Sequence, residues 1–206
     1  IWVGTSEGLS IIENEKIIKF TKEKFLNNET IYKIIGDKHG KIYLGTSNSG
    51  VVIIDAAEKD NYKVSVINTS KGLLSNYVRS LSLKDEKLFV GTDKGLDLIV
   101  NNRVEQFPFK KNLLNHQIMD IIEDEGNLYL ATQKGLCRIV NGKTEFHTLD
   151  KNLEINFLLD LFVDKENNLW IGSYNNGLYR MRDGNFTTIS LDEGLKEKFI
   201  RAVTQN

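Results

Sequence analysis

The chain contains five copies of one short pattern, in which an apolar–aromatic–apolar–small–hydroxyl run is followed closely by a glycine. The copies begin at Ile1, Ile42, Leu88, Leu128 and Leu169, so successive copies are 40 to 46 residues apart. The last copy reads LWIGSYNNGLYRM. A nearly constant period with strand-like content indicates one supersecondary unit used repeatedly, which confines the chain to a repeat architecture.

Each copy divides into four segments with the length and composition of β-strands. They are short, rich in β-branched and aromatic residues and bounded by turn formers, which is typical of strands. The second and third segments are the repeated run and the stretch that begins at its glycine. The fourth carries two apolar residues three apart, and Asn141-Gly142 and Asp183-Gly184 before it predict tight hairpins. The first segments are apolar runs that end in polar residues: Ile31–Asp37, Val78–Lys84, Ile118–Asp124, Leu158–Asp164 and Ile200–Asn206.

Four-stranded antiparallel meanders repeated at this period are the blades of a β-propeller. We therefore predict an all-β fold with a single β-propeller domain over residues 1–206 and the first segments innermost. The chain begins at a second segment and ends after a first segment. This predicts five blades, closed by a split blade of one C-terminal strand and three N-terminal strands. The alternative is that the five repeats belong to a larger ring, in which case two apolar blade faces would be exposed.

Composition narrows the function classes. The formal net charge of −1 argues against a general nucleic-acid binder, which needs a basic face. No apolar run has the length of a membrane span, so we expect membrane contact only through segments outside this chain. The single cysteine, Cys137, lies in a strand-like segment and is expected to be a buried small apolar residue.

The last copy and two linkers resemble a known family. The stretch from Asp164 to Ser173, followed by Gly177-Leu178-Tyr179-Arg180, resembles the two-component regulator propeller repeat. The linker Lys71–Val78 and the shorter Glu193-Gly194-Leu195 resemble the element that joins blades in that family. The resemblance extends over all five copies. It implies a sensor-region β-propeller of bacterial membrane-bound histidine kinases, hybrid regulators or diguanylate cyclases, and hence an extracytoplasmic location in the periplasm or at the cell surface.

Residues that could carry catalysis or bind a metal are scattered. His39 lies in a turn, His116 before an innermost strand and His147 in an outer strand, so a shared metal site is not expected. The acidic turns such as 123–127 lack the ligand spacing of a calcium loop and are expected to be hairpin turns. No nucleophile elbow, zinc-protease or phosphate-loop motif is present. We expect a non-enzymatic protein without catalytic residues, cofactor or metal.

One aromatic residue recurs at the same position of each second segment. We expect these side chains to fill the gaps between neighbouring blades, because each is flanked by apolar residues. The alternative is a stacking platform for sugars or bases. The residues are Trp2, Tyr43, Phe89, Tyr129 and Trp170.

Residues that differ between copies at one shared place are the best candidates for ligand binding, because the scaffold does not explain them. They lie at the second and third positions of the innermost segments and just before them, so we expect them to gather in an axial funnel. Arginines, aspartates and aromatics there suit a small polar, anionic or sugar-like ligand. The alternative is that the arginines pair with the aspartates and line a wet channel. The candidates are Tyr32, Lys33, Tyr77, Arg79, His116, Gln117, Asp120, Phe157, Asp160, Phe199 and Arg201.

Three functional hypotheses follow. The leading one is a sensing or ligand-binding propeller of a signalling receptor. The second is a carbohydrate-binding or protein-interaction module, whose partner is a glycan or another protein. The third is a propeller lyase or hydrolase, which would need paired acids, and Asp120 with Asp160 is the pair to test.

Overall fold

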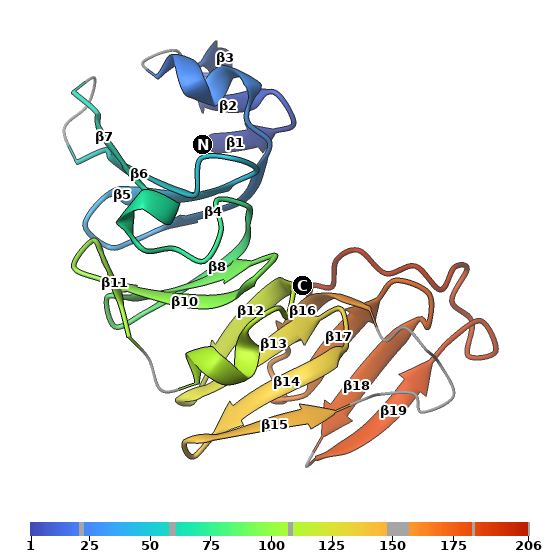
Figure 1. Ribbon diagram of the computed structural model, residues 1–206. Coiled ribbons are helices and arrows are strands. Elements are labelled where there is room, and N and C mark those ends of the chain that lie inside the picture. The colour runs from blue at the N-terminus through green and yellow to red at the C-terminus, as the bar shows by residue number, and fades with distance from the viewer. Residues whose placement is uncertain (21–22, 58–60, 107–108, 148–156, 183, 206) are drawn as a thin grey trace. The chain divides into compact units, whose positions relative to one another are not determined.

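The computed structural model describes residues 1–20, 23–57, 61–106, 109–147, 157–182 and 184–205. In these residues, 19 strands form five antiparallel sheets, each a meander of strands consecutive in the chain (Figure 1). Four sheets have four strands and one has three. The connections contain three short 3-10 helices, η1 (Lys24–Asn28), η2 (Thr69–Lys71) and η3 (Lys110–Leu113). The all-β class and the five meanders are those predicted from the repeats.

The chain divides into two compact units, Ile1–Lys110 and Lys111–Asn206, here called the N-terminal and C-terminal units. The N-terminal unit holds three sheets. The first is β1 (Trp2–Thr5), β2 (Gly8–Glu13) and β3 (Lys16–Lys19); the second is β4 (Ile31–Gly36), β5 (Lys41–Thr46), β6 (Val51–Asp55) and β7 (Lys63–Ile67); the third is β8 (Val78–Lys84), β9 (Lys87–Thr92), β10 (Gly95–Val100) and β11 (Arg103–Glu105). The three-stranded sheet β1–β3 is the incomplete blade that the split-blade arrangement predicts.

The C-terminal unit holds the other two sheets. The first is β12 (Ile118–Asp124), β13 (Asn127–Thr132), β14 (Gly135–Val140) and β15 (Lys143–His147); the second is β16 (Leu158–Val163), β17 (Leu169–Ser173), β18 (Leu178–Arg182) and β19 (Asn185–Ile189). The hairpin predicted at Asn141-Gly142 is confirmed, with φ of 48° and 73° at the two turn residues. Asp183, in the other predicted hairpin, lies outside the described residues.

The structure differs from the prediction at the C-terminus, where an innermost strand was expected over Ile200–Asn206. Residues 200–205 form no strand, and Asn206 lies outside the described residues. A strand requires a ladder of backbone pairs. Here the Ile200 N–H donates to the Ser173 carbonyl at 2.9 Å, and the Val203 N–H donates to the Asp160 carboxylate at 2.7 Å. The segment is therefore joined to the last sheet by isolated hydrogen bonds rather than by a ladder.

Apolar side chains from neighbouring sheets pack together within each unit. In the N-terminal unit, Tyr43 and Ile53 of one sheet share a buried cluster with Leu81 and Val90 of the next. In the C-terminal unit, a buried cluster that includes Leu136 joins the sheet β12–β15 to the sheet β16–β19. Each sheet thus buries an apolar face against its neighbour, which it could not do alone.

The small residue of the repeated run is required by close approach of the following innermost strand. A Cβ on Gly45 would lie 3.0 Å from the Val78 carbonyl oxygen, and one on Gly4 would lie 2.7 Å from the Ile31 side chain. A Cβ on Gly172 would lie 2.9 Å from the carbonyl oxygen of Ile200. Ile200 therefore contacts the last sheet at the position where Ile31 and Val78, at the start of innermost strands, contact the preceding sheets.

Candidate functional site

A β-bulge marks the second position of every innermost strand. The pairing register shifts between Ile31 and Lys33, and the same shift occurs at the start of β8, β12 and β16. A bulge leaves one residue outside the ladder and re-aims its side chain. The bulged residues are Tyr32, Arg79, Met119 and Leu159. The copies carry different side chains at this position, so these variable residues lie outside the strand ladder.

In the N-terminal unit the bulged residues Tyr32 and Arg79 meet Tyr77, which directly precedes β8. The two rings have centroids 5.2 Å apart and their hydroxyls are hydrogen-bonded at 3.1 Å. The Arg79 guanidinium lies 5.0 Å from the centre of the Tyr32 ring and donates to the Tyr77 hydroxyl at 3.3 Å. A cation stacked on one aromatic ring and bonded to another is held in place by both contacts. Lys33 follows on β4, paired with Gly45.

The pKa values of the two tyrosine hydroxyls in this group are shifted in opposite directions. Burial and the neighbouring Tyr77 raise the pKa of Tyr32. Burial also acts to raise the pKa of Tyr77, but its hydrogen bonds with Tyr32 and Arg79 and the charge of Arg79 outweigh it, so the pKa of Tyr77 is lowered. The group offers a cation and polarised phenols, which suits hydroxyl or anionic ligand groups.

A buried carboxylate holds the β5–β6 loop, which lies at the same end of the blade. Glu29 is only 5% exposed. It accepts hydrogen bonds from the Ser49 hydroxyl at 2.6 Å, the Ser47 hydroxyl at 2.9 Å and the Asn48 N–H at 3.0 Å. Sequence reasoning missed Glu29, because it precedes its strand without any local motif and its partners lie on another strand pair. Its three bonds pre-organise the loop.

The C-terminal unit contains a second aromatic group. Phe157 and Phe199 both contact Tyr174, with ring centroids 6.1 Å and 5.0 Å apart. The Arg201 guanidinium lies 5.2 Å from the centre of the Phe199 ring. Tyr174 is 56% exposed and Phe199 39% exposed, so both rings are partly accessible. Phe157, Phe199 and Arg201 were predicted site residues, and Tyr174 belongs to the loop beside them.

Asp120 and Asp160 bind backbone amides. Asp120 accepts from the Leu161 N–H at 3.1 Å, and Asp160 accepts from the Val203 N–H at 2.7 Å. The two residues occupy the same position of successive innermost strands, and each bond runs to the next innermost segment. These carboxylates therefore join neighbouring segments of the C-terminal unit.

His116 and Gln117 contact the sheet β12–β15. The His116 ring stacks on Phe146 at 5.0 Å, and burial, with the nearby Lys134 charge, lowers the pKa of His116. Its Nδ1 atom is buried and finds no hydrogen-bond partner among the described residues. The Gln117 N–H donates to the Gln133 side chain at 2.9 Å.

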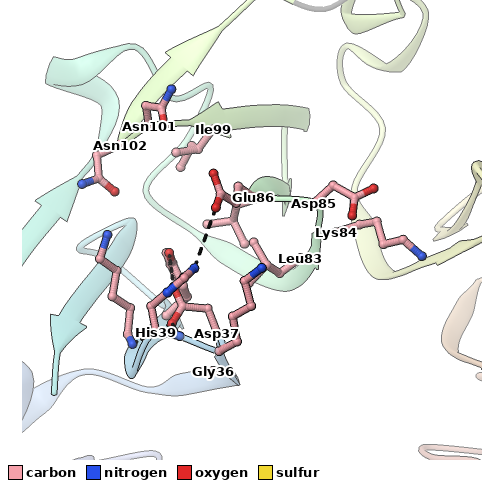
Figure 2. A pocket seen from close by; sticks show the side chains of 14 residues that line it. Gly36, Asp37, His39, Leu83, Lys84, Asp85, Glu86, Ile99, Asn101 and Asn102 are labelled. Carbon is pink, nitrogen blue, oxygen red and sulfur yellow. Dashed lines mark hydrogen bonds and ion pairs between the residues drawn. The ribbon is translucent and has the colours of Figure 1, made fainter. Parts of the chain in front are cut away.

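A pocket of about 590 Å³ lies at the other end of the blades of the N-terminal unit, between the turns that join β4 to β5 and β8 to β9 (Figure 2). Sequence reasoning did not predict it. The pocket is lined by Gly36, Asp37, Lys38, His39, Lys41, Tyr43, Leu83, Lys84, Asp85, Glu86, Leu88, Ile99, Asn101 and Asn102. Figure 2 shows His39 and Glu86 facing each other across it, with the nearest atoms of the pair 3.8 Å apart.

The described residues contain no group of three or more His, Cys, Asp or Glu side chains arranged to hold a metal ion. Within the same ranges, no helix has the length and apolar character needed to cross a bilayer. Cys137 is buried, as predicted, and burial raises the pKa of its thiol to about 12, so it is an unreactive core residue.

Comparison with known proteins supports the repeat assignment. A sequence model of the family described as "Two component regulator propeller" matches residues 152–175. This match confirms the resemblance at the last copy of the repeat. A search of curated proteins found no match.

Solved structures share the fold. The whole chain is similar to an extracellular domain assigned to a hybrid two-component system of B. thetaiotaomicron, with a TM-score of 0.84, 22% identity and 29% of that chain covered. A second such domain from the same organism matches 91% of this chain and 25% of its own, at a TM-score of 0.71 and 23% identity. The WD40 β-propeller domain of Doa1 matches 84% of this chain and 57% of its own, at a TM-score of 0.63 and 11% identity. These similarities confirm the β-propeller class, and the chain spans less than a third of the two bacterial structures.

Proposed function

We propose that this chain, which carries a two-component regulator propeller repeat at residues 152–175, is a non-enzymatic sensing part of a bacterial two-component or cyclase receptor and acts outside the cytoplasm. The family match supports a signalling role. The likeness of the whole chain to extracellular domains of hybrid two-component systems supports the location. The family match and the structural similarity both concern the class of protein, so the type of ligand is inferred from this chain's own residues.

The observation that carries ligand binding is the arrangement of Arg79. Its guanidinium is fixed on Tyr32 and Tyr77 at a bulge, and the equivalent bulges carry Met119 and Leu159. A scaffold role would not require an arginine at one bulge and apolar residues at others. A fixed guanidinium beside two phenols suits a polar ligand that carries a carboxylate or sulfate, such as an acidic sugar.

A carbohydrate-binding or protein-interaction module is the second candidate. The partly exposed rings of Tyr174 and Phe199, with Arg201 over Phe199, favour it, because accessible aromatic side chains stack on sugar rings or partner side chains. A lyase or hydrolase based on Asp120 and Asp160 is less well supported. One oxygen of each carboxylate is engaged by a backbone amide, which is a structural use of these acids.

A glycan array that contains neutral and uronate- or sulfate-bearing oligosaccharides tests the proposal, followed by titration of the best hit. We expect an acidic oligosaccharide to bind and Arg79→Gln to weaken it by roughly 10- to 100-fold, which is the effect of losing a charge-assisted hydrogen bond. Arg103→Gln, at an exposed arginine of β11, is the matched control and should leave the affinity unchanged. An array without hits at high protein concentration, or equal affinities of the Arg79→Gln variant and the parent chain, would refute ligand binding at this group.

A further inference from the structure

The pocket of Figure 2 lies between two neighbouring turns of different length. The turn between β4 and β5 has four residues, 37–40, whereas Asp85 and Glu86 alone join β8 to β9. The longer turn is supported from behind, where the Ala56 N–H donates to the Gly40 carbonyl at 3.1 Å. One wall of the pocket is therefore a braced turn, and the other is a tight two-residue turn with φ of 46° and 62°.

The wall formed by the longer turn presents hydrogen-bond donors. Asp37 is the only acid among the lining residues of this wall, and its oxygens are engaged internally. One oxygen accepts from the N–H groups of His39 and Lys41, both at 2.8 Å, and the other accepts from the Tyr43 hydroxyl at 3.2 Å. Burial opposes ionisation, but these bonds outweigh it and lower the pKa of Asp37. The side chains left for a ligand are Lys38, His39 and Lys41.

The opposite wall presents carboxylates. Asp85 and Glu86 occupy the tight turn, with Lys84 before them on β8. Glu86 contacts His39 across the pocket, and both side chains are largely exposed, 71% and 59%. An exposed pair of this kind contributes little to stability, so a ligand can replace it at small cost.

The floor between the two walls is apolar. It consists of Tyr43, Leu88 and Ile99, which belong to the buried cluster shared by the two sheets. The pocket volume falls in the range of about 300–1,000 Å³ that is typical of small-molecule sites. The cavity thus has a cationic wall, an anionic wall and an apolar floor.

We propose that this pocket is a second ligand site, which takes a small zwitterion with apolar side chains, such as a dipeptide. The ligand's carboxylate is bound by Lys38, His39 and Lys41, and its ammonium group by Asp85 and Glu86. Its side chains lie on Tyr43, Leu88 and Ile99, and the ligand separates the His39–Glu86 pair. The three lysines and three acids of the lining cancel in formal charge, so a ligand without net charge is the one that the pocket favours.

Isothermal titration of the chain with L-leucyl-L-leucine tests this site. Two further probes separate the contributions: N-acetyl-leucyl-leucine amide keeps the side chains without the charges, and glycylglycine keeps the charges without the side chains. We expect L-leucyl-L-leucine to bind at least tenfold more tightly than either. Equal binding of the three peptides, or no binding of any, would overturn the proposal.

Matched variants locate the binding. Glu86→Gln should weaken L-leucyl-L-leucine by roughly two- to fivefold, the effect of losing one exposed ion pair, whereas Glu125→Gln, on the turn between β12 and β13, should leave it unchanged. Both residues are exposed, so neither change endangers folding. Arg79→Gln, which tests the acidic-ligand group, should not affect the dipeptide, and the two sites can therefore fail separately. An unchanged affinity in Glu86→Gln would refute the pocket as the binding site.

Discussion

Single residues in the turns between first and second strands organise the ends of the blades. Asp164 accepts from the Trp170 indole N–H at 2.7 Å and from the backbone N–H groups of Glu166 and Asn168. Asp37 makes the same set with Tyr43, His39 and Lys41. Tyr43 therefore has two roles: its ring packs between sheets, as predicted, and its hydroxyl bonds the turn of its own blade.

The first prediction concerns the pH dependence of the Asp164 contact. Burial opposes ionisation, but hydrogen bonds from Trp170 and Asn168 outweigh it and lower the pKa of Asp164 to about 2. A depressed pKa contributes stability that is complete above the ordinary value of about 4 and is lost as pH falls toward 2. We expect Asp164→Asn to be less stable than the parent at pH 7, with the difference shrinking between pH 4 and pH 2.

Urea unfolding followed by Trp170 fluorescence, in a Trp2→Phe background, measures this difference. The exposed Asp192→Asn provides the control and should match the parent at every pH. A stability difference between Asp164→Asn and the parent that stays constant from pH 7 to pH 2 would contradict the assignment.

The second prediction separates two costs of placing a side chain at a turn glycine. Gly50 and Gly126 have similar φ, 86° and 82°, but a Cβ on Gly50 would lie 2.4 Å from the Ile67 carbonyl oxygen, whereas one on Gly126 meets nothing within 4 Å. Gly126→Ala should cost about 1 kcal/mol of unfolding free energy from backbone strain alone. Gly50→Ala should cost roughly 1–3 kcal/mol more from the clash. Denaturant titrations of both variants give the comparison, and equal losses would contradict it.

At the scale of strands and their connections, one type of contact occurs twice in the C-terminal unit: an aspartate side chain accepts a hydrogen bond from a backbone amide of the next innermost segment. Asp120 reaches Leu161 on β16, and Asp160 reaches Val203 in the C-terminal segment. In the two copies of the C-terminal unit, the third innermost position therefore links neighbouring segments, although an axial location had suggested ligand binding for both residues. The C-terminal segment is held by the Asp160–Val203 and Ile200–Ser173 hydrogen bonds, without a strand ladder.

The third prediction is a reciprocal pair of hydrogen-exchange effects. Asp160→Ala should increase the exchange rate of the Val203 amide by about 10- to 100-fold, because a hydrogen bond to a charged group contributes roughly 1.5–3 kcal/mol. The Leu161 amide should be unaffected in that variant. Asp120→Ala should reverse the pattern. Increases at both amides in either variant would indicate general loosening and contradict the one-to-one ties.

At the scale of the whole chain, the sequence prediction of one closed domain over residues 1–206 can be tested in solution. Five strand sets within one toroid leave no apolar blade face uncovered, whereas an open array exposes two. We expect the chain in solution to have a monomeric mass and the scattering profile of a compact ring. Light scattering coupled to size exclusion, with small-angle X-ray scattering, measures both. A concentration-dependent mass or an extended profile would favour five repeats of a larger ring.

Much of the strand plan could be predicted from the sequence. The first segments expected at Val78–Lys84 and Ile118–Asp124 coincide with β8 and β12, and β4 and β16 end one residue before their predicted ends. The candidate site was predicted less completely. Tyr32, Tyr77 and Arg79 do meet, but Glu29 and the pocket between the turns were missed.

The sequence by itself determined the repeat, its strands and its turns, because each depends on residues close together in the chain: a periodic apolar pattern, a glycine at positive φ, an aromatic at a constant offset. Only the tertiary structure decided what the polar side chains do. Four hydrogen bonds show this, because each joins residues 18 to 45 positions apart in the chain: Glu29–Ser47, Tyr77–Tyr32, Asp120–Leu161 and Asp160–Val203. Such partners become neighbours only when sheets stack, and no local pattern specifies which of them a carboxylate or a hydroxyl will bind.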